Sequence, residues 1–200
     1  MKSLFSSKLA AAFAASSLLA AIAAIPAQAA VDTSGCETPE YTQPFQFAKD
    51  QNWYTLLPGE SPGSFRGDGW QLSGGAQVVT TTLADGSTSQ VLDLPSGSKA
   101  VGPVICVTSE YPTARGMVRN VKGSEGVFYY VEYEGTSTWG HPKNTGQVHG
   151  SGTAWTAVTP VNMQPYNTPG WQPMRITLIP GGKKSDFQVY DLYVDPRMSR

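Results

Sequence analysis

The sequence predicts an all-β domain built as an antiparallel β-sandwich or barrel. The chain holds 21 glycines and 15 prolines among its 200 residues, and they are spread so evenly that few stretches are long enough for a helix. Short runs of β-type residues lie between turn-forming clusters, a pattern typical of sandwiches and barrels. The runs expected to form strands are residues 70–72, 76–83, 89–94, 104–108, 114–121, 127–134, 153–158, 174–180 and 187–194.

The N-terminal segment has the three parts of a secretory signal peptide. Lys2 and Lys8 supply the basic start, residues 9–25 are almost wholly apolar, and Ala27 and Ala29 form a small-residue cleavage site. A membrane anchor is the alternative. However, the apolar run is near the lower length limit for spanning a bilayer, and a helix-breaking proline follows it. We therefore expect cleavage after Ala29 and export from the cytoplasm.

This interpretation divides the chain into three segments. We expect a signal peptide over residues 1–29, an extended lead-in over residues 30–44 and a single β-sandwich domain over residues 45–197. Removing the signal leaves 12 basic against 15 acidic residues, a net charge of −3. Because there is no basic excess, we expect no nucleic-acid partner and no membrane insertion after cleavage. The mature protein is expected to be a secreted, extracellular monomer.

The two cysteines, Cys36 and Cys106, are expected to form a disulfide because the chain is exported. The bond would close a loop of about seventy residues and stabilise the fold by roughly 4 kcal/mol in the loop-entropy description. A metal pair or a reactive thiol is the alternative, and neither has a supporting His or Cys nearby. The bond would fix the N-terminal segment to the body of the domain.

Alternation along three of the expected strands indicates which side chains face the core. Met174, Ile176 and Leu178 alternate with polar residues and should be buried. Three strand faces carry polar or charged residues, and they would form one polar surface with an aromatic if they lay side by side. The alternative is an ordinary solvated face or Arg–Glu cross-strand pairs. The residues concerned are Arg115 and Arg119, Tyr130 and Glu132, and Arg175 and Thr177.

Four sequence patterns that could carry catalysis fail on chemical grounds. Residues 59–63 match the G-x-S-x-G hydrolase motif, but Pro62 follows the serine and lacks the N–H of an oxyanion hole, so a turn is expected. His141 and His149 do not have the spacing of a zinc pair. Glu132 and Glu134 share one strand face, with nothing to indicate a cleft around them. Residues 181–185 lack phosphate-loop spacing and are expected to form a hairpin turn.

Several short motifs together resemble a known group of proteins. They are W-x-L-S-G-G-A at residues 70–76, P-x-x-C at residues 103–106 and D-x-Y-V-D-P at residues 191–196. The chain resembles secreted bacterial proteins whose domain is similar to the galactose-binding-like jelly roll of carbohydrate-binding modules. The resemblance implies a jelly-roll sandwich. It also places Asp191 where many such modules hold a structural calcium, with Glu60 and Asp68 as conceivable partners and no other cofactor expected.

The resulting functional hypothesis is a secreted, non-catalytic domain that binds a glycan or a cell-wall polymer. Sugar rings pack on aromatic side chains, and charged or amide groups pair with hydroxyls. The alternatives are an extracellular structural or protein-interaction module of the envelope and, third, a secreted hydrolase. Trp171 and Tyr166 are additional candidates for stacking on sugars. The candidate ligand-binding residues are Arg115, Arg119, Tyr130, Glu132, Arg175, Trp139 and Trp155.

Overall fold

The computed structural model describes Cys36 and residues 39–108, 112–123, 126–133, 143–148, 152–163 and 171–196. The expected signal peptide lies outside this part of the chain, as do Trp139, Tyr166 and the two histidines. In the described part, no helix is both long and apolar enough to cross a membrane. A single 3-10 turn, η1 (Gln46–Ala48), is the helical element found there.

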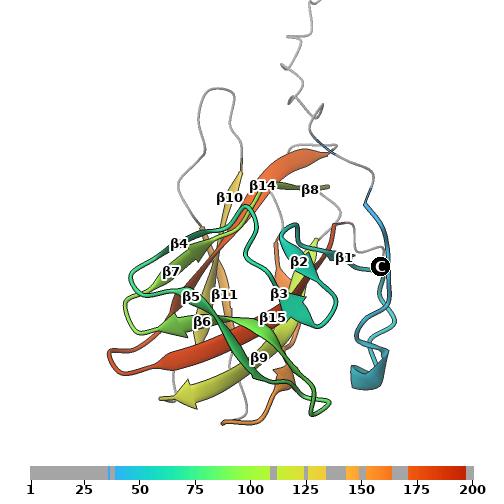
Figure 1. The fold of residues 1–200 in the computed structure, drawn as a ribbon. Coiled ribbons are helices and arrows are strands. Elements are labelled where there is room, and N and C mark those ends of the chain that lie inside the picture. Colours follow the sequence, from blue (N-terminus) through green and yellow to red (C-terminus); the bar gives the residue numbers. More distant parts are fainter. Residues whose placement is uncertain are drawn as a thin grey trace, which may run out of the picture.

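Two antiparallel sheets face each other (Figure 1). The strands of the first sheet lie in the order β12 (Thr156–Ala157), β9 (Thr113–Lys122), β15 (Asp186–Asp195), β6 (Thr88–Pro95) and β5 (Gln77–Thr82). Two short strands also belong to it: β1 (Thr55–Leu56) pairs with β15, and β13 (Val161–Asn162) pairs with β9. The strands of the second sheet lie in the order β11 (Lys143–Val148), β10 (Val127–Tyr133), β14 (Gln172–Pro180), β7 (Lys99–Val101) and β4 (Gln71–Ser73). The short strand β8 (Ile105–Val107) also pairs with β14. A separate hairpin pairs β2 (Glu60–Ser61) with β3 (Ser64–Phe65).

The order of the strands makes this sandwich a jelly roll. The chain crosses from one sheet to the other at seven connections: β4 to β5, β6 to β7, β8 to β9, β9 to β10, β11 to β12, β13 to β14 and β14 to β15. As a result β5 pairs with β6 while β4 pairs with β7, and β9 pairs with β15 while β10 pairs with β14. Nested pairs of this kind define the jelly-roll topology, and the all-β sandwich prediction is confirmed.

Each strand predicted from sequence overlaps a strand of the structure, and short strands were missed. The missed strands are β1, β2, β3, β7, β11 and β13. Most have two or three residues, too few for an alternating pattern to be recognised. One turn was assigned wrongly: residues 181–185 were expected to close a hairpin, but β14 and β15 belong to different sheets. This segment therefore carries the chain from one sheet to the other.

The core fills the space between the two sheets. Val118 and Val189 lie opposite each other in the first sheet and are fully buried. Met174, Ile176 and Leu178 of β14 are also buried, which confirms the predicted core face of that strand. Neighbouring residues in a strand point to opposite faces. The side chains adjacent to Val118 and Val189 in sequence therefore lie on the outer face of the first sheet.

The N-terminal segment is attached to the sandwich at several points and runs along one side of it (Figure 1). Cys36 and Cys106 form the predicted disulfide, with their Cα atoms 5.5 Å apart. Thr42 and Tyr54 exchange two backbone hydrogen bonds of 2.8 Å, and β1 then pairs with β15. Asp50 forms an ion pair with Arg115 of β9. These contacts make the segment an integral part of the domain's surface.

Candidate functional site

The structure separates the three strand faces that carry the predicted polar residues. Arg115 and Arg119 lie on β9 of the first sheet, whereas β10 and β14 belong to the second. The three faces therefore do not form one surface. Glu132 and Arg175 occupy opposite positions in the backbone register of β10 and β14 in the second sheet. A single ligand cannot lie flat across all three strands, because the core separates the two sheets.

Arg115 connects β9 to the N-terminal segment and to the chain at Val158. Its residue is 7% exposed, its Nε donates to the carbonyl of Val158 at 2.6 Å, and its Nη1 pairs with Asp50 Oδ2. The guanidinium lies over the ring of Phe45, with 4.8 Å from Cζ to the ring centroid. Because this cation is buried and paired with a carboxylate of the protein, it offers little surface to a ligand.

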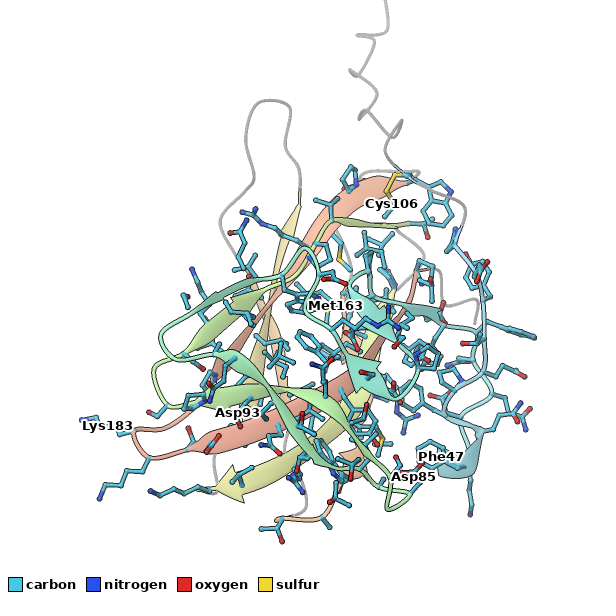
Figure 2. All side chains as sticks on the ribbon, viewed as in Figure 1. Phe47, Asp85, Asp93, Cys106, Met163 and Lys183 are labelled. Atoms are coloured by element: carbon cyan, nitrogen blue, oxygen red, sulfur yellow. A yellow bond between two sulfur atoms is a disulfide. The ribbon has the colours of Figure 1, made fainter. Side chains whose placement is uncertain are left out.

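Arg119 belongs to a row of polar side chains that crosses the outer face of the first sheet. The register places Gln77 of β5, Asp93 of β6, Gln188 of β15 and Arg119 of β9 in line across four strands. Gln77 and Gln188 each donate an amide hydrogen to Asp93, at 3.4 and 2.9 Å. Arg119 donates to Gln188 Oε1 from Nε at 2.9 Å and from Nη2 at 2.6 Å. We call this row the polar ladder; Figure 2 labels Asp93 within it.

A second carboxyl group lies beside the ladder. Asp186 begins β15, opposite Pro95 and Lys122. Burial raises the pKa of Asp186, the Asp93 carboxylate beside it raises this pKa further, and Lys122 opposes the change. Within the ladder, Asp93 and Arg119 lie on opposite sides of Gln188, and Asp186 adds a second acidic group beside Asp93.

Trp155 closes the Arg119 end of the ladder. Its ring lies 4.8 Å from Cζ of Arg119, a cation–π arrangement. Its Nε1–H donates to the carbonyl of Thr82 at 2.8 Å. Tyr190 packs edge-on against the same ring, with centroids 4.7 Å apart. These three contacts fix the half-buried indole in one orientation.

An open cleft of about 370 Å³ lies beside Arg119 and Trp155. This volume falls in the lower part of the range that small-molecule sites occupy. Apart from Arg119, the residues that line it are uncharged: Thr82, Leu83, Ala84, Thr153, Ala154 and Trp155. The cleft combines an aromatic edge, aliphatic surface and one guanidinium, and it brings two of the predicted ligand residues together. The sequence suggested Arg119 and Trp155 as separate candidates, but it could not show that the fold places them in contact.

Glu60 of β2 and Asp191 of β15 are neighbouring carboxylates, and both were among the residues considered for calcium from the sequence. Asp191 adopts a left-handed backbone conformation (φ 51°) at an irregularity in the β9–β15 pairing, and its Oδ1 accepts the N–H of Gly63 at 2.6 Å. Glu60 Oε2 accepts the N–H of Leu192 at 3.0 Å, while its Oε1 is buried with no partner among the described residues. Asp68, the other residue considered, is exposed.

Burial and mutual repulsion shift the ionisation of this pair. Burial raises the pKa of Glu60 well above its usual value, and the neighbouring Asp191 carboxylate raises it further, while the backbone N–H groups of Leu192 and Asp191 lower it. Burial also raises the pKa of Asp191, against the hydrogen bond from Gly63. Burial and these two carboxylates raise the pKa of Tyr193 to about 12. The fold thus holds two acidic groups together without a cation from the described residues.

The carboxylate pair fits the donor chemistry of calcium. Calcium prefers about six to eight oxygen ligands, including carboxylates and backbone carbonyls. Glu60 and Asp191 would supply carboxylate oxygens, one of which is buried and without a partner. The described residues contain no group of three or more acidic, His or Cys side chains placed for a metal. The remaining ligands would therefore have to be backbone carbonyls and water.

Comparison with known proteins gives distant structural likenesses. No protein-family model matches the chain, and no curated protein is similar in sequence. The CBM22-1 xylan-binding domain of Xyn10C from Paenibacillus barcinonensis is 13% identical, with 66% of this chain and 88% of that chain covered and a TM-score of 0.46. The C-terminal family 22 carbohydrate-binding module of Clostridium thermocellum Xyn10B is 13% identical, with 73% and 94% covered and a TM-score of 0.46. The C-terminal CBM6 of LamC from Zobellia galactanivorans is 15% identical, with 62% and 90% covered and a TM-score of 0.38.

Proposed function

We propose that this chain is a secreted, non-catalytic glycan-binding domain and that the cleft at Trp155 is its binding site. The observation that carries the proposal is the convergence of a fixed indole, a guanidinium and a hydrogen-bonded row of amides on one outer sheet face. Glycans present apolar C–H faces beside hydroxyl groups, so they suit a site with an aromatic edge and oriented polar groups. The site is preorganised, which lowers the entropy cost of binding.

The composition of the cleft favours binding over hydrolysis. Glycoside hydrolysis requires two carboxyl groups placed across the scissile bond. The described residues that line the cleft include neither a carboxylate nor a histidine. Asp93, the acidic member of the ladder, accepts hydrogen bonds from two glutamine amides. We therefore propose binding without chemistry at this site.

Replacing Trp155 with alanine should weaken glycan binding about tenfold or more, which corresponds to roughly 1.4 kcal/mol. The change removes the aromatic edge and the support under Arg119. Affinity electrophoresis against a panel of soluble plant and microbial polysaccharides would identify a bound polymer, and calorimetry would measure the change. Thermal melts would verify that the variant is folded at the assay temperature.

Trp53→Ala is the matched control for the loss of one tryptophan. Trp53 is 57% exposed on the N-terminal segment and does not line the cleft. We expect this variant to bind like the wild type. Loss of binding in Trp53→Ala, with Trp155→Ala unaffected, would move the site to the N-terminal segment and contradict the assignment to the cleft.

The exposed aromatics of the N-terminal segment support the alternative role in protein interaction. Phe47 is 70% exposed and Trp53 57%, and large exposed apolar side chains on an ordered segment suit a protein partner. Cross-linking at the cell surface with and without these two rings would test this role. A protein partner captured only when both rings are present, together with no affinity for any polysaccharide, would favour the alternative.

We also infer that Glu60 and Asp191 hold a structural calcium ion. The carrying observation is the buried, unpartnered Oε1 of Glu60 beside a second carboxylate. Bound calcium would supply the positive charge that this pair lacks and would tie the β2–β3 hairpin to β15. The expected consequence is greater stability rather than a part in ligand binding.

A further inference from the structure

Two arginines on β9 have opposite electrostatic surroundings, although they are four residues apart. Arg115 is paired with the carboxylate of Asp50. The contacts that Arg119 makes with described residues are all to neutral groups: the amide oxygen of Gln188, the hydroxyl of Thr81 at 2.6 Å and the ring of Trp155. Among the described residues, no carboxylate lies within 4.0 Å of the Arg119 guanidinium. This partly buried cation therefore has no counter-ion among the described residues.

A partly buried cation without a counter-ion is a costly arrangement unless something compensates for it. Removing a charge from water is unfavourable, and neutral hydrogen-bond acceptors recover only part of the lost hydration. The indole ring of Trp155 adds some cation–π attraction. An anionic group entering the cleft would complete the compensation, and it would gain a charge-assisted hydrogen bond.

The geometry leaves one end of the guanidinium available. Nε and Nη2 are occupied by Gln188 and Thr81, while Nη1 makes no hydrogen bond to the residues that the structure describes. Arg119 also lines the cleft, where every other lining residue is uncharged. A ligand in the cleft would therefore meet a positive charge against a neutral wall.

The acidic residue of the polar ladder and the one in the turn beside the cleft both accept hydrogen bonds from other groups of the protein. Asp93 accepts the amides of Gln77 and Gln188. Asp85, in the turn that follows the cleft residues Leu83 and Ala84, accepts both the N–H and the hydroxyl of Ser87, at 2.9 and 2.7 Å. Neither carboxylate forms an ion pair with Arg119. The counter-charge for Arg119 is therefore missing within the described protein.

We propose that the cleft binds a sugar that carries a carboxylate, a uronic acid unit of an acidic polysaccharide, with Arg119 as its counter-ion. This inference rests on the proposed glycan-binding function and names the chemical class of the ligand. The sugar ring lies against the edge of Trp155 and the aliphatic wall, and its carboxylate accepts hydrogen bonds from Nη1. The polar ladder holds the guanidinium in place through Gln188.

The test compares polygalacturonate with its methyl ester, because esterification removes the charge and leaves the sugar backbone intact. Calorimetry at low salt should show about tenfold or more tighter binding of the acid form, the size expected for one charge-assisted contact. Arg119→Gln should abolish the preference for the acid form. Its amide can still bond to Gln188 and Thr81, and a thermal melt would confirm folding.

Lys183→Gln is the matched control, because it removes one exposed charge in the β14–β15 connection and Lys183 does not line the cleft. Figure 2 shows Lys183 on the other side of the view from Asp85, which follows the cleft residue Ala84. This variant should keep the full preference. Equal binding of the acid and ester forms, lost in Trp155→Ala, would overturn the uronic acid inference and leave the glycan-binding proposal intact. A preference that survives in Arg119→Gln, or disappears equally in Lys183→Gln, would also overturn it. No binding of any polymer by the folded protein would overturn both proposals.

Discussion

Replacing Arg115 with methionine should lower the free energy of unfolding by about 3–5 kcal/mol, the usual cost of breaking a buried ion pair from one side. For a domain of this size, the melting temperature should fall by roughly 6–20 °C. The change removes the partner of Asp50, the donor to the carbonyl of Val158 and the cation over Phe45. It therefore loosens the N-terminal segment from β9. Urea unfolding followed by fluorescence would measure the loss.

A double-mutant cycle on Arg115 and Asp50 separates the energy of their interaction from the effects of each substitution on other contacts. Asp50→Asn should also destabilise the domain, because it leaves a buried guanidinium without a counter-ion. The double variant should lose less than the sum of the two single changes, since neither ion is then left alone. A loss below about 1 kcal/mol for Arg115→Met would contradict the structural role, because that is the range of a surface ion pair.

The same ion pair predicts how stability depends on pH. Burial by itself would raise the pKa of Asp50, but hydrogen bonds from Asn52 and Tyr54 and the Arg115 guanidinium outweigh it and lower this pKa. A carboxyl whose pKa is lower in the folded state stabilises the fold above its unfolded value, near about 4, and loses that contribution as the pH falls through the folded value. The difference between wild type and Asp50→Asn should therefore shrink from pH 7 to pH 3, and a constant difference would contradict it.

Sequence and structure agree best where a local pattern decides the outcome. Alternation in β14 was enough to place Met174 and Leu178 in the core. The expectation that the chain is exported was enough to predict the Cys36–Cys106 disulfide. Both predictions depend on chemistry that acts at short range or on cellular location, and neither requires knowledge of which strands are neighbours.

The candidate sites depend on neighbours that are distant in sequence. Arg115 and Arg119 look equivalent in the sequence, and only the contact with Asp50 distinguishes a structural cation from an available one. The polar ladder joins residues of four strands whose order in the sheet differs from their order in the chain. Glu60 lies inside the stretch first considered as a hydrolase motif. That stretch contains the predicted turn, which joins the unpredicted strands β2 and β3, and its acidic residue contacts Leu192 and lies beside Asp191.

Calcium should stabilise the mature domain by an amount that grows with its concentration. Binding to the folded state alone adds about 2.7 kcal/mol when the free ion exceeds its dissociation constant a hundredfold. For this domain size, the melting temperature should then rise by roughly 5–11 °C. Differential scanning calorimetry in chelator and across a calcium titration would measure the rise, with magnesium as the control ion. Magnesium should have a smaller effect, because it demands a tighter, near-octahedral set of oxygens.

Glu60→Gln isolates the carboxylate pair. Gln keeps an oxygen to accept the N–H of Leu192 and removes the charge that repels Asp191. In chelator this variant should be at least as stable as the wild type, because the repulsion within the pair is gone. In calcium it should gain little, because the ion has lost a charged ligand. Asp68→Asn removes an exposed carboxylate from the neighbouring turn and should keep the full calcium response. If calcium stabilises Glu60→Gln as strongly as the wild type, the ion binds elsewhere and the pair is a destabilising feature that the rest of the fold tolerates.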